Sequence, residues 1–341
     1  MNRRNFLRVG AAAWAWGLSR SLHGDERTSN EVMTVAGPLD ASEMGTTLVH
    51  EHVLVDFIGA DQVSPARYDA DEVFKVALPH LRRVRELGCQ TLIECTPAYL
   101  GRDPRLLQRL AEASGLHLLT NTGYYGARQG KFLPPHTHSE SADQLAQRWL
   151  REWRDGIPPT KIRPGFIKIG VDAGPLTAVN RKLVQAAART HHDSGLTIAA
   201  HTGDGVAAME ELKLVTNAGL DGSAFIWVHA QNESDAALHA RAAEQGAWVE
   251  FDGISPTSVE RHVKLVQNMK QRGLLGRVLV SHDAGWYHVG EPGGGRYRSY
   301  ETLFTEFVPA LREAGFSAAD IRQLLIENPK AAFTIRARAR R

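Results

Sequence analysis

From about residue 44 onward, apolar residues divide the chain into short β-type runs that alternate with longer helical runs. Eight segments have the length and the β-branched content of buried strands. They span residues 46–57, 89–97, 117–126, 165–172, 196–203, 224–231, 247–254 and 277–285. Helical periodicity fills the intervals, with Asp103 and Pro104 as one start signal and with Gly88 and Gly195 as stop signals.

This alternation predicts an α/β protein, a (β/α)8 TIM barrel that occupies residues 32–333 as one domain. No linker-like stretch and no break in composition divides that region. An open doubly wound sheet is the alternative architecture. A glycine-rich dinucleotide turn after the first strand would favour that alternative, and the stretch HEHVLVDFIGADQ at residues 50–62 contains none.

The first predicted strand, TLVHEHVLVDF at residues 47–57, carries two histidines in an apolar run. Successive side chains of a strand point to opposite faces, so Leu48, His50 and His52 are expected on one surface. Buried imidazoles cost desolvation energy unless they are hydrogen-bonded or bind a cation. This stretch alone is compatible with two hydrogen-bonded core histidines and equally with a pair of metal ligands.

Four further polar residues lie at or near the carboxyl ends of predicted strands, where barrels assemble their active sites. They are Lys168, His201, His229 and Asp283. Together with the two histidines of the first strand they supply nitrogen and oxygen donors at one mouth of the barrel. Their order along the chain is His-x-His, Lys, His, His, Asp.

Composition and charge narrow the classes of partner. The chain has 341 residues and a net charge of +2, which gives no electrostatic argument for binding nucleic acid. The chain ends in a basic C-terminal tail, residues 334–341, and its basic cluster RARARR at residues 336–341 is expected to be solvated. Cys89 and Cys95 would be about 20 Å apart along one extended strand, so no disulfide is expected between them.

The first 25 residues are typical of an export signal and not of a folded domain. The motif RRNFLR at residues 3–8 precedes a ten-residue apolar run and resembles a twin-arginine signal. Ten apolar residues are too few to span a bilayer, which takes about 20. We therefore expect a periplasmic protein without a stable membrane anchor, with a cytoplasmic location as the alternative.

The order of the polar strand residues resembles the amidohydrolase superfamily, and several segments resemble its phosphotriesterase family. They are MTVAGPLDASEMGTTLVHEHVLVD at residues 33–56, GRD at 101–103 and ENPKAAF at 327–333. The resemblance implies two divalent transition-metal ions, zinc first and otherwise cobalt, manganese or nickel. The ligands of the first metal would be His50, His52 and Asp283, and those of the second would be His201 and His229.

By the same resemblance, Lys168 would bridge both metals as a carbamate formed with carbon dioxide. A Schiff base between Lys168 and a carbonyl substrate is the alternative, and the surrounding residues in ligand order argue against it. The resemblance further implies that a hydroxide ion bridging the metals attacks the substrate. Asp283 would accept its proton and pass it to the leaving group.

The implied activity is hydrolysis of a small-molecule lactone or carboxylic ester. Tyr125 follows the third strand, where lactonase relatives have a tyrosine and phosphotriesterase itself a tryptophan. It either steadies the oxyanion or packs under a loop. Gly253 and Asn232 stand where phosphotriesterase has its proton-relay histidine and aspartate. The alternatives are phosphotriester hydrolysis and, in another class, a non-catalytic metal-binding or ligand-binding barrel.

The segment after the eighth strand, residues 286–300, is long, aromatic and glycine-rich, which is typical of a mobile loop over the mouth of a barrel. Trp286, Tyr287 and Arg296 are its candidate substrate contacts. Formation of a homodimer is left open by the sequence.

Overall fold

The computed structural model describes residues 30–339, and these residues form a closed barrel of parallel strands. A three-stranded and a six-stranded sheet make up its wall, and β6 and β7 are two halves of one strand interrupted at Thr120. In order around the barrel the strands are β3 (Thr47–Glu51), β5 (Thr91–Glu94), β6 (His117–Leu119), β7 (Asn121–Thr122), β8 (Phe166–Val171), β9 (Ile198–Thr202), β10 (Phe225–Val228), β11 (Trp248–Phe251) and β12 (Val278–Val280).

The wall closes between β12 and β3. The backbone N–H of His50 donates to Ser281 Oγ at 3.0 Å, and the backbone N–H of Asp283 donates to the carbonyl of His50 at 3.0 Å. All eight strand segments predicted from the sequence are present. The (β/α)8 barrel is therefore confirmed, and the open doubly wound sheet is excluded.

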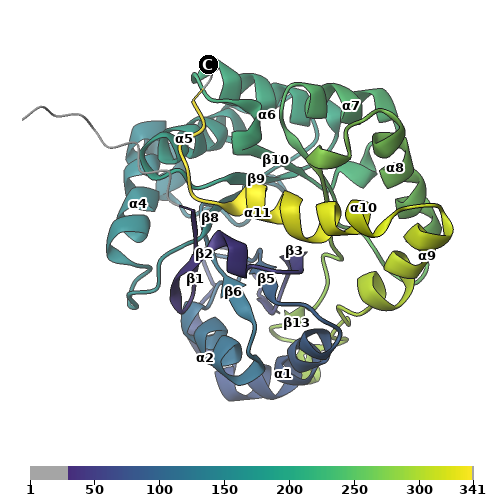
Figure 1. Ribbon diagram of the computed structural model, residues 1–341. Coiled ribbons are helices and arrows are strands. Elements are labelled where there is room, and N and C mark those ends of the chain that lie inside the picture. Colours follow the sequence, from purple (N-terminus) through teal and green to yellow (C-terminus); the bar gives the residue numbers. More distant parts are fainter. Residues whose placement is uncertain (1–29, 340–341) are drawn as a thin grey trace, which may run out of the picture.

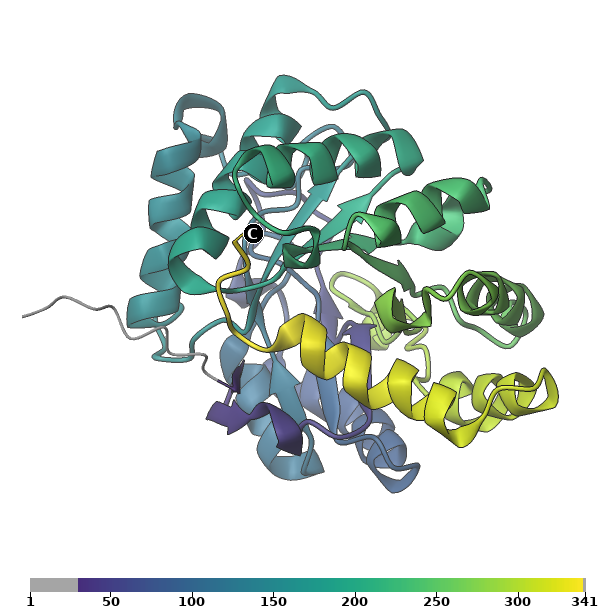
Figure 2. The ribbon, with the colours of Figure 1, turned by 45° about the horizontal axis from the view of Figure 1, so that its top comes forward.

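Helices surround the barrel, as Figure 1 and the view tilted from it by 45° in Figure 2 show. The main ones are α1 (Ala70–Glu86), α2 (Pro104–Ser114), α4 (Ala142–Asp155), α5 (Ala178–Ser194), α6 (Gly205–Asn217), α7 (Ala236–Glu244), α8 (Val259–Gln271), α9 (Val308–Glu313), α10 (Ala318–Arg322) and α11 (Asn328–Phe333). Two predicted boundary signals are confirmed. The Asp103 carboxylate accepts from Leu106 N–H at 3.0 Å at the start of α2, and Gly195 ends α5 with φ +74°.

One buried apolar cluster contains a residue from each of the eight strands of the wall. Side chains from all the strands can meet only inside the barrel, so this cluster is the barrel interior. Its strand residues are Val49, Ile93, Leu119, Phe166, Ala199, Ile226, Trp248 and Leu279. Leu48, by contrast, packs in the other core cluster, which includes the helices. The pairing register shifts between Leu48 and Glu51, as in a β-bulge. The expectation that Leu48 shares a face with His50 is therefore wrong, because the bulge breaks the alternation.

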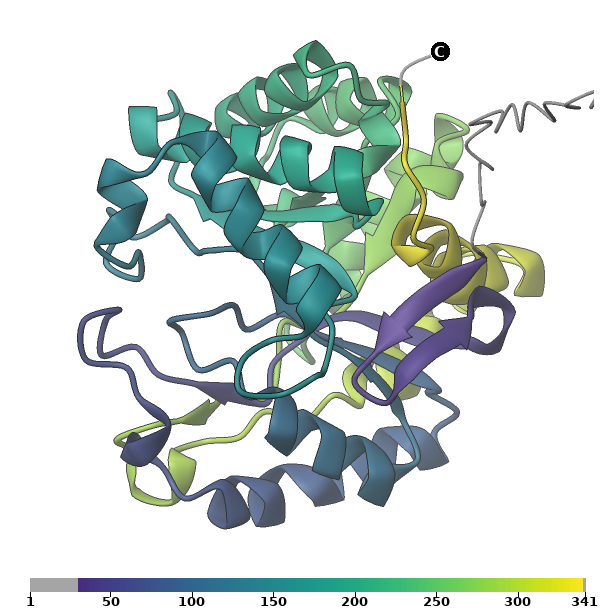
Figure 3. The same ribbon diagram turned by 90° about the vertical axis from the view of Figure 1, so that its left-hand side faces the viewer.

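A hairpin and a helix cover the end of the barrel opposite the mouth (Figure 3). The antiparallel strands β1 (Glu31–Thr34) and β2 (Gly37–Asp40) form the hairpin, which was not among the predicted strands. Val32 of the hairpin and Phe333 of α11 both join the interior cluster. The described part of the chain contains no helix long and apolar enough to cross a membrane.

The backbone of the described C-terminal tail pairs with the barrel at Arg336 and Arg338. The expectation of a solvated tail is wrong for the buried side chain of Arg338, whereas Arg336, Ala337 and Ala339 are exposed. Arg338 is only 5% exposed. Its guanidinium donates to the carbonyls of Ala331, Ala332 and Thr334. These carbonyls lie at the C-terminal end of α11, where no further helical turn supplies backbone donors. The proposed export signal, by contrast, falls within residues 1–29, outside the described residues.

Both cysteines are buried and free, as expected. The segment after β12 is also anchored, which differs from the mobile loop expected from its composition. Its strand β13 (Tyr287–His288) pairs with β4 (Leu54–Val55), and Tyr300 donates its hydroxyl to the carbonyl of His52 at 2.6 Å.

Candidate metal centre

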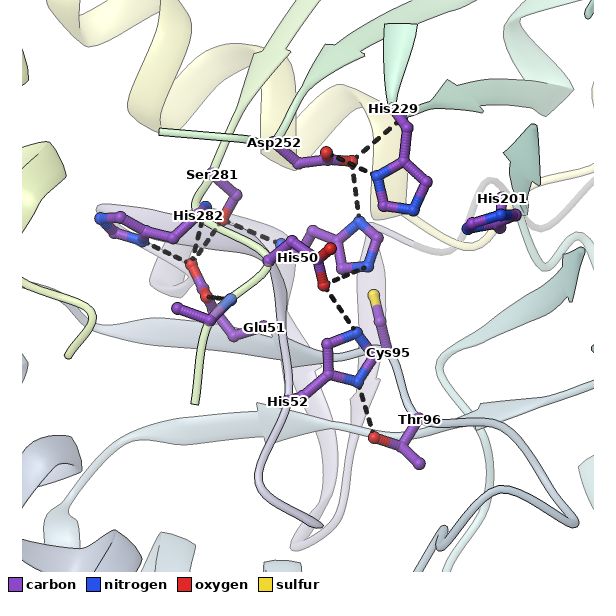
Figure 4. A network of polar contacts seen from close by, with 12 residues as sticks. His50, Glu51, His52, Cys95, Thr96, His201, His229, Asp252, Ser281 and His282 are labelled. Carbon is purple, nitrogen blue, oxygen red and sulfur yellow. Dashed lines mark hydrogen bonds and ion pairs between the residues drawn. The ribbon is translucent and has the colours of Figure 1, made fainter. Parts of the chain in front are cut away.

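The histidines predicted from the sequence converge at the carboxyl ends of the strands (Figure 4). The ring centroid of His50 lies 5.3 Å from that of His52 and 5.1 Å from that of His229. The rings of His229 and His201 are 4.5 Å apart. Lys168 Nζ lies 3.4 Å from His50 Nε2. The structure thus brings together residues from β3, β8, β9 and the end of β10.

Asp283 reaches the same cluster from the end of β12. Its Oδ1 atom lies 3.1 Å from His52 Nε2 and 3.7 Å from His50 Nε2. Asp283 has φ +52° and His229 has φ +63°, so both adopt left-handed backbone where few non-glycine residues occur. Such strain is typical of functional sites. Here it ends the regular strands and turns both side chains toward the cluster.

Glu51 holds the backbone on either side of Asp283. Its buried carboxylate accepts from Ser281 Oγ at 2.8 Å, from His282 Nδ1 at 2.6 Å and from Ala284 N–H at 2.9 Å. Sequence reasoning missed this residue, because its contacts come from a strand that lies more than 200 positions away in the sequence.

Two acidic residues of β11 and the turn after it orient His50 and His229. Asp252 Oδ1 lies 2.7 Å from His229 Nδ1, and Asp252 Oδ2 lies 3.0 Å from His50 Nδ1. Glu250 Oε1 lies 2.7 Å from His50 Nδ1. Since carboxylates occupy the Nδ1 atoms, both imidazoles are left with Nε2 for another partner. Sequence reasoning missed Glu250 and Asp252 as site residues, although they alternate on an apolar strand as His50 and His52 do.

The other two histidines also have one ring nitrogen occupied. His52 Nδ1 lies 2.7 Å from Thr96 Oγ1, which leaves His52 Nε2 facing Asp283. His201 has the opposite arrangement. Its Nε2 atom lies 3.0 Å from the Tyr125 hydroxyl, and its Nδ1 atom is left for another partner. Tyr125 therefore touches a predicted ligand directly. Its ring also packs against Phe132 of the neighbouring loop, with the ring centroids 5.9 Å apart, so its role as an oxyanion donor or as a packing residue stays a prediction.

Burial keeps three of these imidazoles neutral at physiological pH. Desolvation, aided by the charge of Lys168, lowers the pKa of His50 to about 3. Desolvation also holds the pKa values of His52 and His201 well below their usual range. For His229, burial opposes protonation, but the neighbouring Asp252 outweighs it and raises the pKa. Neutral imidazole is the form that binds a metal ion.

The donor set fits a divalent cation. Asp283 Oδ1 is buried without a hydrogen-bond donor, although two imidazole nitrogens lie close to it. One ligand atom from each of His50, His52 and Asp283 can be chosen so that all lie within 4.8 Å of one another. Carboxylate and imidazole together are ligands of zinc and of neighbouring transition metals. His50, His229 and Asp252 meet the same distance criterion. Asp252 is already engaged there as a hydrogen-bond acceptor, so the first trio is the better candidate.

A cavity of about 380 Å³ opens above this cluster, a size that suits a small molecule. All six predicted metal-site residues line it, and so do Tyr125 and Trp286. Its remaining lining residues are Phe57, Cys95, Pro97, Leu100, Arg128, Lys131 and Phe132. Of the three predicted contacts in the segment after β12, only Trp286 faces this cavity. Tyr287 is buried elsewhere, and Arg296 is exposed.

The residues that replace the proton relay are also absent from the cavity wall. A side chain at Gly253 would begin 3.0 Å from Gln231 Nε2, which itself donates to Asp252 at 2.7 Å. Gln231 thus contacts Asp252 from the side that Gly253 leaves open. Asn232 ends the short turn Ala230–Asn232 that follows His229.

Comparison with known proteins agrees with this geometry. The family model described as "Phosphotriesterase family" matches residues 30–333 of this chain. The phosphotriesterase homology protein of Escherichia coli K12 is 31% identical, over 85% of this chain and 98% of its own length. The aryldialkylphosphatase of Saccharolobus solfataricus is 24% identical, over 87% of this chain and 97% of its own length. A mutant phosphotriesterase-like lactonase from Deinococcus radiodurans superposes with a TM-score of 0.80 at 26% identity, over 89% of this chain and 99% of that one. The chain belongs to the phosphotriesterase family.

Proposed function

We propose that this protein is a binuclear metal-dependent hydrolase of lactones or carboxylic esters. The observation that carries the proposal is the convergence of His50 Nε2, His52 Nε2 and Asp283 Oδ1 on the floor of a cavity. No hydrogen-bond donor satisfies Asp283 Oδ1 there. Membership of a hydrolase family and similarity to a lactonase structure support the same activity.

In this proposal the first metal is held by His50, His52 and Asp283, and the second by His201 Nδ1 and His229 Nε2. Zinc is the metal we favour, and cobalt, manganese or nickel would suit the same donors. Lys168, which is 2% exposed, would carry a carbamate formed with carbon dioxide and so reach both metals. When bound, the metals would polarise the scissile carbonyl and activate water.

The protein side chains would position the substrate and move its proton. Asp283 lies at the cavity floor and would accept a proton from the attacking water and return it to the departing alkoxide. A lactone keeps that alkoxide tethered beside Asp283 after ring opening, so no longer relay is needed. The Tyr125 hydroxyl, held beside His201, would donate to the carbonyl oxygen.

The substrate preference follows from the replaced relay residues. With Gly253 and Asn232 in place of the relay, a tethered alkoxide is favoured over the separate leaving group of a phosphotriester. We expect kcat/KM for a lactone or activated carboxylic ester at least about tenfold above that for any phosphotriester, or roughly 1.4 kcal/mol in the transition state. The measurement is a hydrolysis screen of one metal-loaded preparation against lactones, aryl esters and triesters.

The outcomes of that screen separate the candidate functions. A preference for triesters would support the aryldialkylphosphatase-like alternative and contradict ours. No turnover of any ester by fully metal-loaded protein would favour a non-catalytic binding barrel. Tyr125→Phe should lower kcat for lactones, and unchanged lactone turnover in that variant would remove Tyr125 from the mechanism.

We also propose export through the pathway that carries folded proteins, on the basis of Arg3, Arg4 and the apolar run that follows. The full chain fused to a reporter should reach the periplasm. Replacing both arginines, Arg3→Lys with Arg4→Lys, should retain the fusion in the cytoplasm. Fractionation of the two strains measures this, and export of the double variant at the wild-type level would disprove the proposal.

A further inference from the structure

Two cationic side chains, Arg128 and Lys131, line the cavity that contains the candidate metal centre. Both residues are exposed, so they lie where the cavity meets solvent. Within residues 30–339, neither one forms an ion pair with a carboxylate. Lys131 Nζ donates to the carbonyl of Phe57 at 2.7 Å, which leaves two ammonium protons for another acceptor.

The backbone that presents these cations is fixed. Arg128 and Gln129 both have φ +58°, a left-handed conformation that is uncommon for such residues. The carboxylate of Asp172 holds them there, because it accepts from Arg128 N–H at 2.7 Å and from Gln129 N–H at 3.1 Å. Lys131 is held as well, since its carbonyl accepts from Ala60 N–H at 3.2 Å. The two charges are therefore presented from an ordered turn.

A continuous aromatic wall joins the metal centre to the cations. The Trp286 ring lies 4.2 Å from that of His52, and the Phe57 ring stacks on Trp286 at 5.6 Å. Phe132 follows at 6.0 Å from Phe57, and Lys131 Nζ lies 5.4 Å from the centroid of the Phe132 ring. The cavity thus has a reactive floor, an apolar middle and a cationic entrance.

We propose that the substrate carries a carboxylate, separated from the scissile ester or lactone carbonyl by a short apolar chain, and that Arg128 and Lys131 bind this carboxylate. The inference rests on the hydrolase function proposed above and specifies its substrate class. Guanidinium matches the planar carboxylate through paired hydrogen bonds, and ammonium adds a second charge. A neutral substrate would fill the apolar middle and leave Lys131 facing water, while Arg128 would keep only its contact with the Tyr125 hydroxyl.

The test compares two esters of one chain length on the metal-loaded enzyme. They are the p-nitrophenyl monoester of adipic acid, which has a free carboxylate, and p-nitrophenyl methyl adipate, which is neutral. We expect kcat/KM for the anionic ester to exceed that for the neutral ester by at least about tenfold. This ratio should fall as sodium chloride is raised, because salt screens charges near the surface.

Variants assign the preference to these residues. In Lys131→Gln the anionic-to-neutral ratio should fall severalfold, and in Lys131→Glu it should fall below one. Lys264→Gln is the matched control, because Lys264 is an exposed lysine of α8 that pairs with Glu260. The ratio should stay at the wild-type value in that control. Equal kcat/KM for the two esters in the wild-type enzyme would overturn the proposal.

A binding measurement separates this proposal from the hydrolase function. In titration calorimetry, adipate should bind the wild-type protein at least about tenfold more tightly than hexanoate, which lacks the second carboxylate. The Arg128→Gln, Lys131→Gln double variant should bind both acids equally. If no ester is hydrolysed but adipate keeps this advantage, the hydrolase function fails and the anion site stands. Equal binding by the wild-type protein would disprove the anion site, whatever the turnover.

Discussion

Three candidate metal ligands, His50, His52 and His229, are oriented by partners that the sequence identifies less readily than the ligands themselves. His50 and His52 stand out because polar side chains are rare in an apolar strand. Glu250 and Asp252 show the same alternation, but acids near the end of a strand are also common for other reasons. Thr96 has no sequence signal at all. It becomes a partner of His52 only because β5 lies beside β3.

Lys168 provides the sharpest test at the scale of single residues. Lys168→Ala should lose the proposed bridge, lower the metal content and reduce kcat/KM by at least about a hundredfold, since even indirect partners of metal ligands contribute 10–100-fold. Added short carboxylic acids should restore part of the metal content and part of kcat/KM, because a carboxylate can replace the carbamate. Elemental analysis and turnover are measured together. Full metal content and full activity in the untreated variant would exclude the carbamate.

At the scale of elements, β3 combines a bulge with a clamp. The register shift between Leu48 and Glu51 places Val49 in the interior cluster, while the histidines that follow face the cavity. Glu51 then ties the segment around Asp283 to the same strand. The period-two pattern could predict the strand and its histidines. It could not predict the bulge, which depends on pairing with β5.

The C-terminal segment gives the second prediction at this scale. Arg338→Ala should remove the donor that satisfies three carbonyls at the end of α11, and should cost about 2–3 kcal/mol of unfolding free energy. For a chain of this size the melting temperature should fall by about 3–5 °C. Calorimetric melting measures the change. Arg336→Ala, an exposed neighbour, is the control, and equal melting of the two variants would contradict this role for Arg338.

For the whole molecule, the barrel could be predicted because eight strand segments alternate with helices and each segment carries its own local signal. The hairpin of β1 and β2 and the packed C-terminal tail could not be predicted. The two strands are short, and the packing of Arg338 arises only from tertiary contacts. The position of the candidate site followed from the barrel rule that carboxyl ends meet at one mouth. The cationic entrance did not follow from it, because Arg128 and Lys131 lie in a turn without periodicity.

The most direct measurement is anomalous diffraction at the zinc edge, from crystals of the protein reconstituted with zinc and bicarbonate. Two anomalous peaks are expected at the cavity floor, one beside His50, His52 and Asp283 and one beside His201 and His229. Electron density should also extend beyond Lys168 Nζ toward both peaks. A single peak, no peak, or an unmodified lysine side chain between two peaks would contradict the binuclear, carbamate-bridged centre.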